Sequence, residues 1–111
     1  WVRQHVINYL AVYKNYPISL MQVERLIKYN NLNTRADLIV NDRDFNPIVL
    51  VECKAPNITI GKDAFDQIAK YNFSLKAKYL FVTNGLKHYC CSINYANGKT
   101  KFLKDIPAKI I

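Results

Sequence analysis

The first apolar positions of the chain recur three or four residues apart, a spacing that puts their side chains on one face of a helix. They are Val2, Val6, Tyr9, Leu10 and Tyr13. We therefore expect an amphipathic helix over residues 1–15, closed by Pro17.

The next segments carry the β-branched and apolar residues typical of strands. Residues 20–29 predict a first strand, followed by a turn at Asn30 and Asn31. Residues 35–41 and 48–54 predict two more strands, and the polar residues between them predict a hairpin.

After Pro56 and Gly61 the apolar period lengthens from two residues to 3.6, which predicts a second helix. Its expected apolar face consists of Ala64, Phe65, Ile68, Ala69 and Leu75. We expect this helix to connect two parallel strands by a right-handed crossover.

Three strands are expected in the last third of the chain, over residues 79–83, 88–95 and 100–103. Asn84-Gly85 separates the first two, and Asn97-Gly98 is typical of a two-residue hairpin between the last two. The order helix, three strands, helix, three strands predicts an α/β domain with a mixed central β-sheet flanked by helices.

Half of the 111 residues are hydrophobic, which is enough for one core and one domain over residues 1–111. The sequence opens at Trp1 instead of a methionine, so we expect a fragment of a longer chain. No apolar run approaches the roughly 20 residues of a membrane span, and no signal peptide is visible. We therefore expect a cytoplasmic protein with no membrane partner.

Sixteen Lys and Arg against eight Asp and Glu give a net charge of +8. This balance indicates either a protein that binds phosphate backbones or merely a basic, soluble surface. Three cysteines, two of them adjacent, suit neither a disulfide framework nor a zinc site and fit a reducing compartment. His88 and Cys90 could ligate a metal from one strand face, but packing is favoured because no second pair accompanies them.

Two carboxylates lie where the chain otherwise reads as buried strand. Glu52 interrupts the run Ile-Val-Leu-Val-Glu-Cys-Lys and shares a strand face with Lys54, while Val51 and Cys53 face the other way. Asp37 is flanked by apolar residues on the preceding strand. If the hairpin is symmetric about its loop, residues whose numbers sum to 89 pair, and Asp37 lies opposite Glu52.

Two like charges at such a position destabilise a sheet unless a cation lies between them. Mg²⁺, or Mn²⁺ in its place, would resolve the conflict because it takes hard oxygen ligands and keeps several waters. Lys54 could then orient a water and stabilise charge on an attacked phosphate. The alternative is a structural ion pair between Glu52 and Lys54 on a solvated strand. The facing Asp37 and the basic chain favour the hydrolytic site.

These residues resemble a known signature. Asp37, followed by Glu52-Cys53-Lys54, resembles the bipartite motif of the PD-(D/E)XK nuclease superfamily, with Arg35-Ala36-Asp37 in place of its Pro-Asp half. More specifically, four ordered blocks resemble the N-terminal domain of type I restriction enzyme R subunits, and the likeness runs from Trp1 to about Tyr95. The blocks are Arg-Ala-Asp-Leu-Ile-Val, Leu-Val-Glu-Cys-Lys-Ala-Pro, Phe-Asp-Gln-Ile-Ala-Lys-Tyr-Asn and Thr-Asn-Gly-Leu-Lys-His-Tyr-Cys-Cys.

The resemblance implies a restriction-endonuclease-like core in which Asp37 and Glu52 bind Mg²⁺, with the main-chain carbonyl of Cys53 as a further ligand. It also implies that Lys54 is the catalytic lysine.

Gln67 and Tyr71 match a Gln-x-x-x-Tyr element found in one branch of the superfamily. They stand i and i+4 on the second helix, where they form one stripe that could position DNA. The alternative is the border of an amphipathic helix, with Tyr71 half in the core.

Two features depart from the family pattern. Many superfamily members place an acidic residue on the first helix, yet residues 1–19 contain none, so it lies upstream of Trp1 or is absent. Glu24 is the only nearby acid. The R subunits also contain an ATP-driven translocase, but this chain has no G-x-x-x-x-G-K-[ST] loop and thus no ATP site.

We therefore expect a magnesium-dependent endonuclease domain of a type I R subunit that hydrolyses DNA and contacts mainly phosphates, without reading sequence. The resemblance implies methyltransferase and specificity subunits as partners of the full-length protein. Two alternatives are a catalytically inactive module that binds nucleic acid or docks a subunit, and a stand-alone repair or resolvase-like nuclease.

Overall fold

The computed structural model describes residues 1–29 and 32–109, apart from five side chains within them. Those side chains belong to Lys28, Tyr29, Leu32, Asn33 and Tyr71. The turn expected at Asn30 and Asn31 lies outside the described residues.

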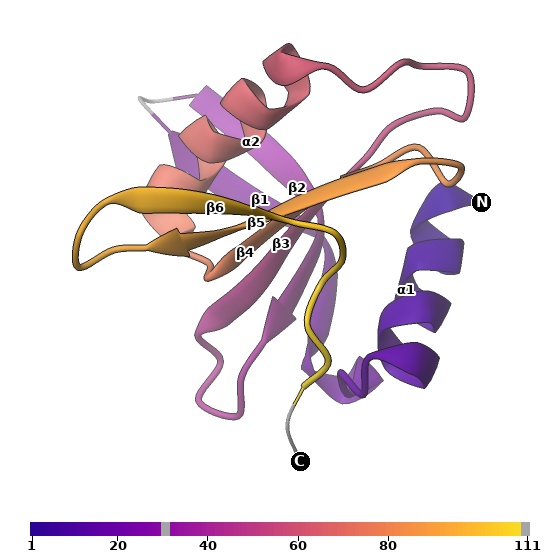
Figure 1. Cartoon of the computed structure of the whole chain (residues 1–111). Coiled ribbons are helices and arrows are strands. Elements are labelled where there is room, and N and C mark those ends of the chain that lie inside the picture. The colour runs from indigo at the N-terminus through magenta and orange to yellow at the C-terminus, as the bar shows by residue number, and fades with distance from the viewer. Residues whose placement is uncertain (30–31, 110–111) are drawn as a thin grey trace.

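Two long helices, a short 3-10 helix and six strands make up the described chain (Figure 1). In order they are α1 (Val2–Tyr13), η1 (Ile18–Leu20), β1 (Met21–Tyr29), β2 (Leu32–Asn41), β3 (Pro47–Cys53), α2 (Lys62–Leu75), β4 (Tyr79–Thr83), β5 (His88–Asn94) and β6 (Lys99–Leu103). The predicted order of helices and strands is confirmed.

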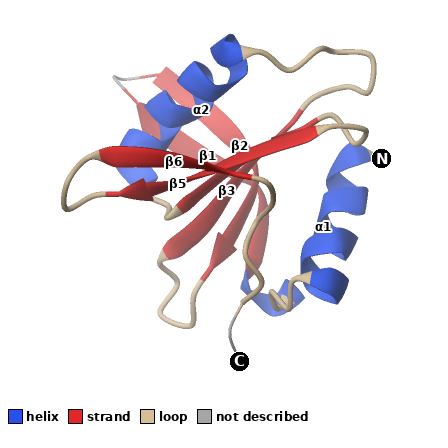
Figure 2. Cartoon of the chain, in the orientation of Figure 1, coloured by secondary structure: helices blue, strands red, loops and turns tan. Residues whose placement is uncertain are grey.

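The six strands form one sheet in the order β1-β2-β3-β4-β5-β6. Every neighbouring pair is antiparallel except β3 and β4, which are parallel and connected through α2. The predicted mixed sheet and parallel crossover are thereby confirmed. Figure 2 shows α1 and α2 on opposite sides of the sheet.

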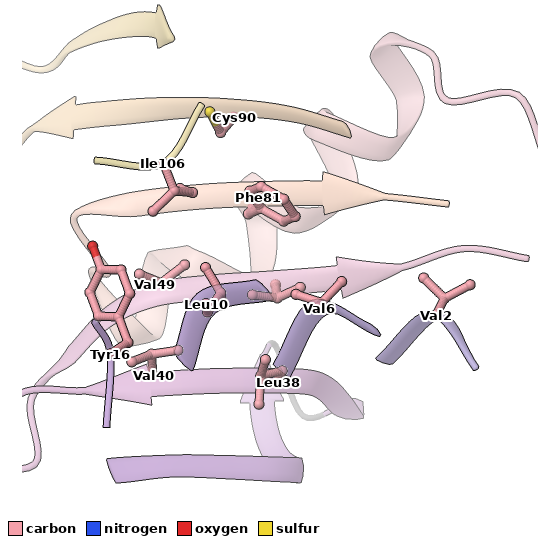
Figure 3. Packing of buried hydrophobic residues seen from close by; sticks show 11 residues of the cluster. Val2, Val6, Leu10, Tyr16, Leu38, Val40, Val49, Phe81, Cys90 and Ile106 are labelled. Carbon is pink, nitrogen blue, oxygen red and sulfur yellow. The ribbon is translucent and has the colours of Figure 1, made fainter. Parts of the chain in front are cut away.

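Each helix covers its own hydrophobic core. Beneath α1, the buried Val2, Val6 and Leu10 pack against strand residues that include Leu38 and Phe81 (Figure 3). Beneath α2 lies a second cluster of buried residues: Ile27, Ala36, Ile39, Leu50, Ile68, Ala77, Leu80, Val82 and Cys91. Burial of each large aliphatic side chain contributes about 1.5–3 kcal/mol, so the sheet is fixed from both sides.

The buried face of α2 differs from the predicted one. Ala69 is exposed, whereas Asn72 is buried. The Asn72 Oδ1 accepts a hydrogen bond from the N–H of Ala77, and its Nδ2 donates to the Tyr95 hydroxyl. A polar residue is tolerated here because these bonds satisfy its amide. The contact stripe of α2 therefore runs through Ile68 and Asn72, to one side of Ala69.

Two chain reversals also differ from expectation. The β5–β6 connection has four residues instead of two, because Asn94 pairs with Lys99 and the N–H of Gly98 donates to the Asn94 carbonyl. Helix α1 ends at Tyr13, and Asn15 with its φ of 63° reverses the chain before Pro17. A left-handed asparagine is a common helix terminator.

The cysteines are free thiols, and Cys90 and Cys91 are buried on opposite faces of β5. His88 stacks on Phe81 at 5.3 Å between ring centroids. Within the described residues, no group of three His, Cys, Asp or Glu side chains gathers as a metal site. No helix in that part of the chain is long and apolar enough to cross a membrane.

Candidate functional site

The predicted register of the β2–β3 hairpin is confirmed. Leu38 pairs with Val51 and Val40 pairs with Val49, so the residue numbers sum to 89. A register shift after Val40 accommodates the loop. The Leu38–Val51 pair ends this ladder, so the predicted direct pairing of Asp37 with Glu52 is not part of it. Asp37 immediately precedes Leu38 in β2.

Beyond the last β2–β3 pair, the Asp37 side chain, and not the main chain of β2, accepts the hydrogen bond from β3. Its Oδ2 accepts a hydrogen bond from the main-chain N–H of Cys53 at 2.7 Å. Strand β3 itself continues along β4 to the Cys53–Thr83 pair, and the N–H of Lys54 donates to the Thr83 carbonyl. Asp37 therefore lies at the point where β2 separates from β3.

Glu52 lies close enough to Asp37 for the two charges to interact. Burial raises the pKa of the Glu52 carboxyl, and the negative charge of Asp37 raises it further, while Lys54 opposes both effects. The Glu52 side chain is only 15% exposed. A cation between the two carboxylates would relieve this repulsion, and metal binding here remains a prediction.

Lys54 follows the last residue of β3 and lies on the same side as Glu52. Its Nζ is 3.5 Å from Glu52 Oε1 and donates a hydrogen bond to Gln67 Oε1 at 3.4 Å. Since Gln67 belongs to α2, the lysine ammonium is held between β3 and α2. The structure thus brings together four of the five predicted site residues.

Tyr71, the fifth, lies one turn after Gln67 in α2, but its side chain is outside the described residues. The stripe formed by these two residues remains a prediction. An open hollow borders Lys54 and Gln67 and gives a ligand access to the lysine. Its other lining residues are Ile58, Thr59, Gly61, Asp63 and Ala64.

The first helix supplies a base instead of an acid near the site. Arg3 forms an ion pair with Glu24 at 3.1 Å, and its charge acts on the Cys53 thiol. Burial, followed by the charge of Asp37, nevertheless raises the pKa of that thiol to about 12. Glu24, the nearest acid noted in the sequence, is therefore engaged by Arg3.

Two features of the site could not be read from residue types. The Cys53 N–H is a main-chain group, and its bond to Asp37 depends on where two strands part. Glu24 adopts a left-handed conformation, with a φ of 53°, inside β1. Glutamate gives no sequence signal for this conformation, which glycine and asparagine adopt far more readily.

The geometry defines an α/β domain with two carboxylates and a lysine gathered at the end of a central strand. The family of the type I restriction enzyme R protein N terminus (HSDR_N) matches residues 1–107, and the chain belongs to this family.

A solved structure shares the fold. It is a fragment assigned to an HsdR subunit of a type I restriction enzyme from Vibrio vulnificus YJ016, 23% identical, with a TM-score of 0.67. The similarity covers 96% of this chain and 22% of that chain, so this chain spans about a fifth of that protein fragment. No protein with a curated function matches.

Proposed function

We propose that this domain is a magnesium-dependent endonuclease with a PD-(D/E)XK core, acting on DNA as part of a type I R subunit. The observation that carries the proposal is the cluster of Asp37, Glu52 and Lys54 at the end of β3. Family membership and a net charge of +8 support DNA as the substrate. Methyltransferase and specificity subunits would select the target for the complete protein.

The donor set fits a hard divalent cation. Asp37 and Glu52 offer carboxylate oxygens, and the repulsion that raises the pKa of Glu52 is relieved when a cation is present. These two residues would hold Mg²⁺ or Mn²⁺, with the Cys53 carbonyl as a further donor. When bound, the ion supplies Lewis-acid stabilisation of charge on the phosphate and lowers the pKa of a bound water.

The protein residues have separate tasks in this hydrolysis. The N–H of Cys53 fixes one oxygen of Asp37 and so orients the carboxylate. The ammonium of Lys54, held by Glu52 and Gln67, donates hydrogen bonds to a phosphate oxygen as negative charge builds on it. Water adds to phosphorus and gives up a proton, the bond to the leaving oxygen breaks, and that oxygen takes up a proton, so the two proton transfers balance.

Plasmid nicking with matched variants tests the proposal. Asp37→Ala should abolish Mg²⁺-dependent nicking and Mn²⁺ binding in calorimetry, whereas Asp44→Ala, in the exposed hairpin loop, should change neither. Lys54→Ala should retain Mn²⁺ binding and lower nicking roughly 100-fold or more, while Lys99→Ala should not. Unchanged nicking by Lys54→Ala would show that the proposed mechanism is wrong.

A second candidate is a non-catalytic module that binds DNA or docks a subunit. It is favoured by the lack of an acid on α1 and by the absence of a third acidic, histidine or cysteine ligand among the described residues. The same experiment separates the two functions. DNA binding that needs no divalent ion and persists in Asp37→Ala, together with no nicking by the wild type, would favour the module.

A further inference from the structure

Glu24 has an unusual backbone conformation for a strand residue. Its φ is 53°, in the left-handed region that non-glycine residues rarely occupy. The other described non-glycine residues with positive φ are Asn15, Phe45 and Lys76, all of which lie outside strands. Such a conformation within a strand persists only where the surrounding structure requires it.

The β1–β2 ladder is interrupted at the same place. Val23 pairs with Leu38 and Arg25 pairs with Ala36, so Glu24 and its facing residue Asp37 form the missing pair. The residue numbers sum to 61 on both sides of the gap, so no extra residue is inserted. The two strands are therefore distorted together and remain in register.

This distortion changes which core the strand faces. Leu38 lies in the core beneath α1, whereas Ala36, two residues earlier, lies in the core beneath α2. In a regular strand, residues i and i+2 face the same side. The β1–β2 hairpin thus rotates at Asp37 and packs against α2 (Figure 1).

The rotation has a direct effect on the candidate site. Strand β3 stays on β4 as far as Cys53, whereas β2 pairs with β3 only from Leu38 onward. The Cys53 N–H is thereby left for the carboxylate of Asp37. The ion pair between Glu24 and Arg3 connects the distorted position to the first turn of α1.

We propose that Glu24 is a positioning residue: its left-handed backbone rotates the hairpin and so places the Asp37 carboxylate on the Cys53 N–H, beside Glu52. The consequence for metal binding rests on the proposed function, but the positioning of Asp37 does not. The backbone conformation, and not the glutamate charge, is the property that this position must supply.

Glu24→Asn and Glu24→Ala form a matched pair for the test. Both remove the charge and the Arg3 ion pair, but asparagine tolerates the left-handed region and alanine does not. The primary readout is hydrogen exchange of the Cys53 amide by NMR, with Phe81 in β4 as an internal reference. Asp37→Ala calibrates the loss of the bond, and Leu26→Val is a control at an exposed β1 position without a positive φ.

Glu24→Asn should keep the Cys53 amide as protected as in the wild type. In Glu24→Ala the Cys53 amide should exchange roughly 10-fold faster, while exchange of the Phe81 amide is unchanged. This variant should also bind Mn²⁺ roughly 10-fold more weakly. The inference is overturned if the Cys53 amide is equally protected in the Glu24→Asn and Glu24→Ala variants. It is also overturned if both variants lose that protection equally. If the wild type binds no Mn²⁺, the proposed function fails, while the exchange result still decides the role of Glu24.

Discussion

The Oδ2 of Asp37 accepts a hydrogen bond from the main-chain N–H of Cys53, 2.7 Å away on the neighbouring strand. Cys53 lies between Glu52 and Lys54 in the sequence. This bond therefore connects Asp37 on β2 to the segment that carries the other two residues of the candidate site. It leaves the second oxygen of Asp37 available to other partners. The orientation of one acidic side chain thus depends on the exact place where β2 leaves β3.

The first prediction concerns the charge coupling between Asp37 and Glu52. Asp37→Asn keeps an oxygen for the Cys53 N–H but removes the negative charge that raises the pKa of Glu52. The pKa of Glu52 should therefore fall in this variant, although burial still holds it up. A ¹³C NMR titration of the glutamate carboxyls measures the change, with Asp44→Asn as the distant control. An unchanged pKa would show that the two carboxylates do not interact.

The second prediction concerns pH. The pKa of Glu52 is raised above its ordinary value of 4.5, so the folded chain holds this proton more tightly than the unfolded chain does. The protonated Glu52 therefore contributes to the free energy of unfolding below about pH 4.5. This contribution is lost as the pH rises through the folded-state pKa of Glu52. At neutral pH without divalent ions, the charged Glu52 therefore destabilises the fold.

Glu52→Gln removes this effect. We expect it to stabilise the fold at pH 7.5 by about 0.5–1 kcal/mol, or roughly 2–8 °C in melting temperature. The gain should disappear near pH 4. Thermal unfolding of both proteins in EDTA at the two pH values checks this, with Asp44→Asn as the control. A variant less stable than the wild type at pH 7.5 would contradict the expected sign.

Much of the site could be predicted because it depends on local periodicity. Glu52 and Lys54 share a strand face by their spacing alone. The loop of the β2–β3 hairpin is nearly symmetric, so the pairing sum of 89 also follows from the sequence. The periodicity of the sequence does not indicate where the pairing between two strands ends. The Asp37–Cys53 bond and the left-handed Glu24 both arise from that tertiary feature.

The buried face of α2 shows a second limit. Ala69 and Asn72 both border the apolar stripe, and hydropathy alone favours the alanine. The structure buries Asn72 because Ala77 and Tyr95, which follow in the chain, satisfy its amide. These partners lie outside α2, whereas the buried face of a helix is predicted from the helix residues alone. A buried polar residue is therefore identified only when its partners are known.

The third prediction concerns Gln67, whose Oε1 accepts a hydrogen bond from the Nζ of Lys54. Gln67→Ala removes the acceptor that α2 provides, so the lysine ammonium should lose its orientation. We expect nicking to fall roughly 10-fold with Mn²⁺ affinity unchanged. Gln4→Ala, at an exposed position of α1, is the control. If nicking is unaffected, the contact with α2 has no part in placing Lys54.

The fourth prediction concerns the buried amide of Asn72, which fixes the end of α2. Asn72→Ala leaves the N–H of Ala77 without its acceptor, Asn72 Oδ1. An unsatisfied buried donor costs about 2 kcal/mol, or roughly 8–16 °C in melting temperature. Tyr95→Phe should cost less, because the Ala77 carbonyl keeps its bond from Asn72 Nδ2. Ala69→Gln is the control, since Ala69 is exposed. Chemical and thermal unfolding give all three values. If Ala69→Gln destabilises the fold more than Asn72→Ala, then α2 packs through the face that hydropathy predicts.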